Sequence, residues 1–404
     1  MPTGARLKGA TLKLETYIKI FLKVEILELI CTDGYIYLIL FLFLWFNTIL
    51  ESSVQISKYK YFLFSLSSII LISFIGFRWE TGTDWEAYKD LFDTLQLDWS
   101  FLFNVYHFDI GYVLFNALIK LFTNDYTLFL ICNSGITIFF LAKLIIKTSP
   151  YPNLSLLFFY TNFMIAQFMG SNRRMMAMVF ILWFFYYIYN KEKKYSYLNL
   201  GVSFIFHRSA IANILGYYIP KKVFSLQQTI TILIISFIIG ILQVPARTIE
   251  IAGNFLSTFI NNPIIEKMVF YSENNEEHLV YGTGSLIIST TLAVAKRSIL
   301  LAFYIYIIKR HNIDKLTQFF YNIYILGFAG YLFFIGSFFQ MLTAYLAFIE
   351  ILLIGRMYAY TNGKVKLIFC TLISFYGFLQ MANALNVYPE LYIPYIPFWS
   401  NLQR

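Results

Sequence analysis

The sequence predicts an all-α integral membrane protein, a polytopic helical bundle with about 10–12 transmembrane or re-entrant helices. Of its 404 residues, 59% are hydrophobic and only 13% are charged, whereas a soluble domain carries about 25% charged residues. Apolar stretches of roughly 16 to 23 residues recur from end to end, and each is near the length that crosses a ~30 Å hydrocarbon core as a helix. These observations exclude a soluble globular domain.

Ten apolar stretches are predicted to cross the membrane, and two further segments are exceptional. The ten are residues 35–50, 61–77, 126–146, 154–170, 175–189, 229–244, 286–308, 317–339, 341–360 and 366–381. Segment 110–122 is apolar but short and contains Lys120, so it suits a helix lying in the membrane interface. Segment 197–219 is long enough to cross, yet it carries His207 and Arg208 at its middle.

The loops between these spans differ in charge, and the positive-inside tendency assigns the basic loops to the cytoplasm. The basic loops contain Lys58, Lys60, Lys143, Lys147, Lys191, Lys193, Lys194, Lys221, Lys222, Lys309, Arg310, Lys315, Lys364 and Lys366. Two long loops with an excess of acidic residues, 78–109 and 245–285, then lie outside. This orientation is consistent only if segment 110–122 does not cross and segment 197–219 enters and returns to the same side.

The sequence predicts one polytopic membrane domain over residues 35–404, preceded by an N-terminal extension over residues 1–34. The extension contains five basic residues and is expected to be amphipathic or interfacial. The net charge of +9 fits the bias of cytoplasmic loops, so nucleic acid is not an expected partner. Three cysteines without CxxC pairing suggest neither a disulfide framework nor a metal site.

Charged side chains near the hydrocarbon are costly, so those that occur there are the first candidates for function. Three clusters stand out: residues 77–88 after the second span, residues 172–174 at the start of the fifth span, and residues 206–209 inside the exceptional long segment. In the predicted orientation the first two clusters lie outside, and a re-entrant third cluster joins them. Lys296 and Arg297 also fall inside a span, where they either line the same cavity or mark a break between two half-helices.

Arginines beside an outward-facing cavity suit an anionic ligand such as a pyrophosphate, because guanidinium groups bind phosphate oxygens bidentately and stay charged. Three nearby acids, Glu80, Asp84 and Glu86, are placed to accept hydrogen bonds from sugar hydroxyls. One carboxylate, or His207, is a candidate to take a proton from an attacking hydroxyl. Each arginine also has a purely structural interpretation, as a snorkelling side chain or an interface anchor.

Four short motifs occur in order within residues 77–210, about a third of the chain. They are Phe77-Arg78 with Gly82-x-Asp84 and Tyr88, then Phe108-Asp109-Ile110-Gly111-Tyr112, then Arg173-Arg174-Met175-Met176-Ala177, and finally Phe206-His207-Arg208-Ser209-Ala210. In this order and spacing they resemble the EpsG-type branch of the Wzy polysaccharide polymerases. The second motif departs from the family pattern at its acid and proline positions, and the third has arginine in place of glutamine. A later arginine of the family is not evident around residues 340–345, where Gln340 stands instead.

The resemblance implies the all-helical membrane fold of the C-class glycosyltransferases, with a cavity above the membrane midplane on the periplasmic or extracellular side. It implies transfer of a growing glycan from undecaprenyl pyrophosphate onto a new lipid-linked repeat unit, at the outer face of a bacterial plasma membrane. No nucleotide sugar, cofactor or metal is expected. The expected partners are the undecaprenyl-pyrophosphate-linked oligosaccharide, membrane lipids, a chain-length regulator and a flippase.

The resemblance also suggests roles for individual residues, with arginines holding the leaving pyrophosphate while Asp84 or His207 activates the acceptor hydroxyl. Preorganised positive charge would then supply much of the rate. The expected catalytic residues are Asp84, His207 and Arg173, and the expected substrate-binding residues are Arg78, Glu80, Gly82, Tyr88, Arg174, Arg208 and Arg297.

Other functions also fit a membrane protein with these charges. A flippase for lipid-linked oligosaccharide would bind the same pyrophosphate, but transporters often have two halves of matching hydropathy, and here the charged candidates gather on one side. A membrane-bound sugar acyltransferase would turn its base toward an acyl donor, often from the cytoplasm, and His207 does not decide this. A purely structural subunit would leave the buried pair His207 and Arg208 unexplained.

Overall fold

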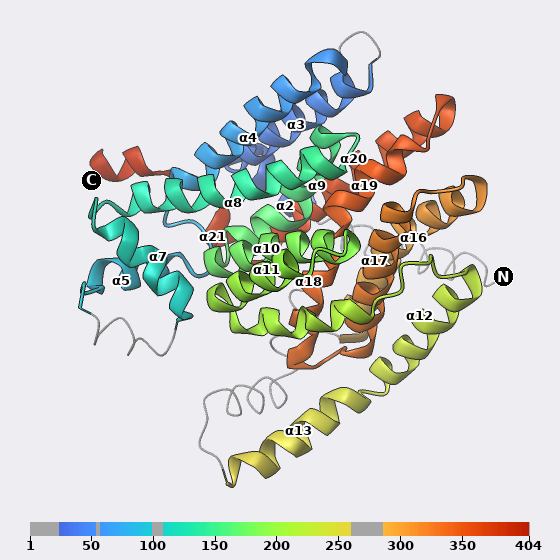
Figure 1. The fold of residues 1–404 in the computed structure, drawn as a ribbon. Coiled ribbons are helices and arrows are strands. Elements are labelled where there is room, and N and C mark those ends of the chain that lie inside the picture. The colour runs from blue at the N-terminus through green and yellow to red at the C-terminus, as the bar shows by residue number, and fades with distance from the viewer. Residues whose placement is uncertain (1–23, 54–56, 99–107, 260–285, 404) are drawn as a thin grey trace, which may run out of the picture.

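The computed structural model describes residues 24–53, 57–98, 108–259 and 286–403 (Figure 1). The described chain is a bundle of helices with one two-stranded sheet. In chain order its elements are α2 (Val24–Thr32), α3 (Tyr35–Ser52), η1 (Ser57–Tyr59), α4 (Lys60–Gly76), β1 (Arg78–Trp79), α5 (Trp85–Thr94), α7 (Ile110–Lys120), α8 (Tyr126–Thr148), α9 (Pro152–Phe159), η2 (Tyr160–Phe168), α10 (Asn172–Tyr189), α11 (Lys193–Phe206), η3 (Arg208–Tyr218), α12 (Leu226–Ile241), α13 (Val244–Ser257), α16 (Leu286–Arg310), α17 (Lys315–Phe333), η4 (Phe338–Thr343), α18 (Ala344–Ala347), α19 (Glu350–Ala359), α20 (Gly363–Val387), α21 (Pro389–Tyr392), β2 (Ile396–Pro397) and η5 (Phe398–Gln403).

Helices long and apolar enough to cross a membrane confirm the predicted all-α polytopic membrane fold. Within the described ranges there are five: Tyr35–Ser52, Ser57–Gly76, Tyr126–Thr148, Phe339–Ala359 and Gly363–Val387. Helices α12 and α13 qualify together as a sixth, although they are bent by 51° at their junction. Other predicted spans, such as those of α10 and α17, are helical but do not qualify on their own. The full number of 10–12 transmembrane or re-entrant helices therefore stays a prediction.

The structure adds detail to two parts of the predicted domain plan. The first residues of the predicted outer loop 245–285 are helical, because α13 covers Val244–Ser257, and residues 260–285 lie outside the described chain. In the N-terminal extension, residues 1–23 also lie outside it, whereas α2 packs against α3 and α20 with Ile26 and Ile30 buried. The part of the extension that the structure describes therefore belongs to the bundle.

The loops predicted to be cytoplasmic meet at one end of the bundle, which we call the basic end after Lys60, Lys221 and Lys366. The Lys60 ammonium donates to the carbonyl oxygen of Pro150, between α8 and α9, at 3.2 Å. The Lys221 ammonium donates to the carbonyl oxygen of Tyr189, at the end of α10, at 3.0 Å. These contacts join loops that the sequence grouped by charge alone, while the compartment that the basic end faces stays a prediction.

Segment 197–219 forms a hairpin that enters the bundle and returns to the basic end. Its limbs α11 and η3 are separated by His207, whose backbone is extended (φ −155°, ψ 108°). The far ends of the limbs meet, since the Ser196 and Tyr217 hydroxyls lie 2.6 Å apart. Helix α11 has 14 residues and is thus about 21 Å long, too short for a ~30 Å core. Both limbs therefore end at the same end of the bundle, and the predicted return to one side of the membrane stays a prediction.

The opposite end of the bundle, which we call the site end, is covered by two short helices and a late segment of the chain. Helices α5 and α7 lie together beyond the start of α8 (Figure 1), around a small aromatic core that includes Trp85, Tyr112 and Phe129. Helix α7 has 11 residues, about 16 Å, which is shorter than a ~30 Å hydrocarbon core, and its interfacial position stays a prediction. The strand β2 pairs antiparallel with β1, an arrangement that the sequence did not predict.

Candidate functional site

Two consecutive arginines open helix α10 at the site end. The chain is extended at Ser171 (φ −145°, ψ 94°) and becomes helical at Asn172, so Arg173 and Arg174 lie in the first turn. Neighbouring residues on a helix point about 100° apart, and the two guanidinium groups accordingly reach different neighbours. That of Arg173 lies 5.3 Å from the ring of Phe108, and that of Arg174 lies 5.9 Å from the ring of Tyr345. The two guanidinium groups therefore reach from the start of α7, beside Phe108, to α18, which contains Tyr345.

Asp109, at the start of α7, draws two arginines together. Its Oδ2 accepts from Arg173 Nη1 at 2.9 Å, and its Oδ1 lies 3.3 Å from Arg208 Nε and accepts from the Arg208 backbone N–H at 3.2 Å. The Asp109 side chain is 9% exposed. Burial raises the pKa of Asp109 and the Arg173 guanidinium opposes that rise. One acid thus connects the second, third and fourth sequence motifs.

His207 sits at the tip of the hairpin with two hydroxyl groups against one ring nitrogen. Its Nδ1 lies 2.6 Å from Ser209 Oγ and 3.1 Å from the Tyr345 hydroxyl. Burial, together with Arg173 and Arg174, lowers the pKa of His207 to about 3. The imidazole is therefore neutral at physiological pH. When a hydroxyl donates to Nδ1, the ring proton resides on Nε2.

Asp84 and Tyr88 bring the first motif to the arginine pair. Asp84 immediately precedes α5 and is half-buried. Burial raises the pKa of Asp84, and the nearby Arg173 opposes that rise. One turn further on, the Tyr88 hydroxyl lies 2.8 Å from the Ser171 hydroxyl, and burial raises the pKa of Tyr88 to about 12. The predicted residues Asp84, Tyr88 and Arg173 therefore belong to one site.

Gly82 acts through its backbone. It has φ +114°, and a Cβ atom there would lie 2.1 Å from the carbonyl oxygen of Met169. Its N–H donates to the carbonyl oxygen of Leu391 at 2.9 Å. Glu80 is exposed, has φ +45° and accepts a hydrogen bond from Trp79 Nε1 at 3.2 Å. No hydrogen bond or ion pair joins Glu80 to the arginine cluster among the described residues, and the contact of both residues with substrate stays a prediction.

Arg78 lies behind the arginine pair and is completely buried. Its Nη2 donates to Asn172 Oδ1 at 2.8 Å, while its Nε and Nη1 have no hydrogen-bond acceptor among the described residues. Asn172 immediately precedes Arg173, so this contact fixes the start of α10. The arrangement supports a positioning role for Arg78, and the predicted substrate contact remains untested.

Arg297 belongs to a different cluster, between α16 and α17. Its guanidinium lies 3.9 Å from the ring of Tyr331, and its Nη1 donates to the carbonyl oxygen of Ala293 at 3.4 Å. Nearby, the Tyr304 hydroxyl donates to Glu350 Oε1 at 3.1 Å. The structure does not show Arg297 in contact with the other predicted site residues, so its substrate-binding role stays a prediction.

The sequence interpretation missed two residues that organise the site. Asp109 was visible as the acid of the second motif, and Gly111 explains its placement, because a Cβ at Gly111 would lie 2.8 Å from the carbonyl oxygen of Ile205. This close packing of α7 on α11 brings Asp109 to Arg208. Tyr345 had no local signal, since it joins His207 only through the tertiary fold.

Comparison with known proteins bears on most of the chain. A family model described as the EpsG family matches residues 61–397, which include every predicted site residue. No curated protein and no solved structure matches the chain.

Proposed function

The chain belongs to the EpsG family of Wzy-like polysaccharide polymerases, and from this premise we propose that it joins undecaprenyl-pyrophosphate-linked oligosaccharide repeat units into a surface polysaccharide. The observation that carries the proposal is the convergence of Arg173, Arg174 and Arg208 around a buried acid and a neutral imidazole. The product is an O-antigen, a capsule or an exopolysaccharide, and the site faces the outside of a bacterial plasma membrane.

The arginines provide a site for the pyrophosphate of the donor. Asp109 binds Arg173 through one carboxylate oxygen and aligns Arg208 through the other. A guanidinium carries five N–H donors, and the Arg208 side chain stays 60% exposed, so Asp109 holds it in position while its donors remain accessible to phosphate oxygens. Three guanidinium groups face two carboxylates, Asp84 and Asp109, so the site keeps a net positive charge for an anionic ligand.

The proposed reaction is a displacement at the anomeric carbon of the donor sugar. The acceptor hydroxyl oxygen forms a bond to that carbon, while the bond between the carbon and the pyrophosphate oxygen breaks. The pyrophosphate leaves with the bonding electron pair, and the arginines stabilise its negative charge. The proton of the acceptor hydroxyl passes to a base of the enzyme.

Asp84 is the better candidate for this base. Its raised pKa makes it a stronger proton acceptor than an ordinary aspartate, whereas Asp109 is committed to two arginines. His207 has a lowered pKa and two hydroxyl groups at Nδ1, which suits it to donate from Nε2 to the substrate. The sequence left either Asp84 or His207 as the base; here Asp84 accepts the proton and His207 donates a hydrogen bond.

The location of the site supports an outward-facing reaction. The arginine cluster lies at the site end, opposite the lysine-rich loops of the basic end. Because basic loops favour the cytoplasm, the site end is expected to face the periplasm or the exterior. Lipid-linked repeat units delivered there by a flippase would be the substrates, and a chain-length regulator is an expected partner.

The test is a gene deletion in the native bacterium, complemented with wild type, Arg173→Ala or His207→Ala. Lipid-linked and surface glycans are then separated on a gel. We expect the deletion and Arg173→Ala to lose the long-chain ladder while single repeat units still reach the surface. Arg247→Ala is the matched control, because Arg247 is exposed on α13 and makes no ion pair among the described residues.

Two outcomes would contradict the proposal. Loss of all exported repeat units in the deletion strain would indicate a flippase, since nothing would then reach the outer face. A normal ladder in Arg173→Ala, with the protein present in the membrane, would remove that arginine from the reaction. Immunoblotting of membranes separates loss of activity from loss of protein.

A further inference from the structure

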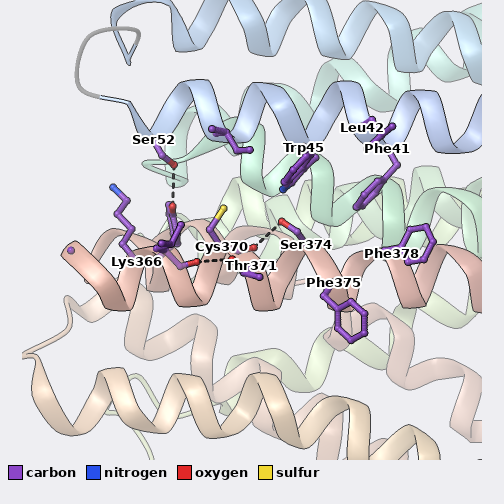
Figure 2. Close-up of a pocket in the computed structure, with 14 residues that line it drawn as sticks. Phe41, Leu42, Trp45, Ser52, Lys366, Cys370, Thr371, Ser374, Phe375 and Phe378 are labelled. Carbon is purple, nitrogen blue, oxygen red and sulfur yellow. Dashed lines mark hydrogen bonds between the residues drawn. The ribbon is translucent and has the colours of Figure 1, made fainter. Parts of the chain in front are cut away.

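A groove lies between α3 and α20, and none of the residues of the arginine cluster lines it (Figure 2). The cavity has a volume of about 560 Å³, within the range of about 300–1,000 Å³ typical of small-molecule sites. Its walls are mostly apolar, and Figure 2 shows Phe41 and Phe378 at one end. Leu42 and Phe375 on its rim are 45% and 55% exposed. In a membrane protein these exposed rims face lipid.

The groove is polar only at its other end. Figure 2 shows Ser52 and Lys366 together there, and the Ser52 and Tyr358 hydroxyls lie 3.0 Å apart. The Lys366 ammonium is half-buried, donates to the Tyr151 hydroxyl at 2.5 Å and lies 5.1 Å from the Tyr358 ring. No carboxylate pairs with Lys366 among the described residues. An ammonium has three donors, so Lys366 retains capacity for an anionic group.

The dimensions of the groove match one leaflet of a bilayer. The α20 residues that line it run from Gly363 to Phe378, and the part from Lys366 to Phe378 rises about 18 Å. Half of a ~30 Å hydrocarbon core is about 15 Å. The positive charge therefore sits where a headgroup would lie, and the apolar walls extend along the depth of its acyl chain.

From this geometry we infer that the α3–α20 groove binds an anionic glycerophospholipid of the leaflet at the basic end, with its phosphate at Lys366 and one acyl chain between the helices. A lipid-linked sugar donor fits less well, because its pyrophosphate is proposed to bind at the site end, where α3 begins and α20 ends. In the groove, by contrast, the positive charge of Lys366 lies at the basic end and the apolar walls extend toward the site end. This inference does not depend on the polymerase activity.

The open mouth of the groove is consistent with a bound headgroup. Gly363 lies at the start of α20, and a Cβ built there meets no atom within 4 Å. Lys60 lies at the same end, because it donates to Pro150, the residue before Tyr151. A phosphate at Lys366 would therefore have both open space and a second cation nearby.

Lipid binding to the purified full-length chain tests the inference by native mass spectrometry. Phosphatidylglycerol, phosphatidylethanolamine with the same acyl chains, and undecaprenyl phosphate are titrated in parallel. We expect phosphatidylglycerol to bind more tightly than phosphatidylethanolamine, and Lys366→Gln to weaken its binding about fivefold, since one lysine near a lipid surface contributes on that order. Lys364→Gln is the control, because Lys364 is exposed on the same helix and does not line the groove.

A second variant tests the apolar part. Thr371 lines the groove and is exposed, so Thr371→Trp fills the groove without displacing a core side chain. It is expected to reduce binding of both phospholipids. Equal binding of both phospholipids by the wild type, or unchanged phosphatidylglycerol binding in Lys366→Gln, would overturn the inference. So would displacement of undecaprenyl phosphate alone by Thr371→Trp, which would assign the groove to the carrier lipid.

Discussion

The two ends of the bundle are both cationic, yet they use their charges in different ways. At the basic end, Lys60 donates to the carbonyl oxygen of Pro150 in the α8–α9 loop, and Lys221 donates to those of Ile188 and Tyr189 at the end of α10. At the site end, Arg173 and Arg208 converge on the single carboxylate of Asp109. A lysine at a helix C-terminus or on a loop carbonyl stabilises the fold, and basic loops favour one orientation. Arginines that share an acid preorganise a binding site, so net charge alone does not distinguish the two ends.

The difference extends to what surrounds each charge. The basic-end loops are short connections between helices, whereas the site end carries α5, α7, the tip of the α11–η3 hairpin and β2. This additional structure buries Asp109 and half-buries Asp84. Burial is what shifts their pKa values, and chemistry needs such shifts. The comparison therefore predicts that similar substitutions will act unequally at the two kinds of position.

The largest expected effect is that of Asp109→Asn, compared with Asp93→Asn. The first change removes the charge that aligns Arg173 and Arg208, and should lower the polymerisation rate roughly 100-fold, the order found on removing one charge-stabilising group. Asp93 pairs with Lys89 on the surface of α5, and exposed pairs contribute about 0–1 kcal/mol, so Asp93→Asn should retain activity. The measurement is polymer formation by purified protein from lipid-linked repeat units. Equal rates for the two variants would contradict the role given to Asp109.

An intermediate effect is expected from pH. As the base, Asp84 must be deprotonated, so the rate should decrease as the pH is lowered. Because the pKa of Asp84 is raised, this decrease should begin at a higher pH than for an ordinary aspartate, whose pKa is about 3.9. The fall should approach about tenfold per pH unit below that pKa, and Asp84→Asn should lack it. His207 has a pKa of about 3, so the rate profile should show no inflection near 6.5. An inflection there that disappears in His207→Gln would assign the base to His207.

The smallest expected effect is a difference in stability between alanine substitutions at two glycines with positive φ, Gly82 and Gly363. Gly363→Ala at the basic end meets no neighbouring atom and costs only the left-handed backbone, about 1–2 kcal/mol. Gly82→Ala at the site end adds a contact of 2.1 Å with the Met169 carbonyl oxygen, so its cost should exceed that range. Thermal unfolding in detergent measures both variants. A Tm loss for Gly82→Ala no greater than that for Gly363→Ala would show that this part of the site end yields easily.

Much of the fold followed from hydropathy because the bilayer imposes length and polarity on each span. Helices α3, α4 and α8 begin within a residue of the predicted starts. The exceptional segments 110–122 and 197–219 were recognised because Lys120, His207 and Arg208 conflict with a crossing. The break of 341–360 into η4, α18 and α19 was not predicted, since a continuous apolar stretch gives no signal of where backbone hydrogen bonding changes.

The sequence predicted several individual residues of the site, but it did not predict which of them contact one another. Arg173, Asp84 and His207 carry charge or protons near hydrocarbon, and this cost makes them visible in a sequence. Asp109 and Tyr345 act through partners that lie 64 and 138 residues away, and such distances depend on helix packing. The β1–β2 pairing was hidden for the same reason, because two strands of two residues each leave no periodic pattern.

That pairing has a consequence for how the protein is made. Ile396 pairs with Trp79, and the carbonyl oxygen of Tyr392 accepts a hydrogen bond from Tyr37 in α3. The ribosome synthesises Tyr37 and Trp79 more than three hundred residues before their partners, so the first helices enter the membrane long before this contact exists. The wall behind Arg78 is completed only after α20 has been inserted. This wall is therefore among the last parts of the site end to form during synthesis.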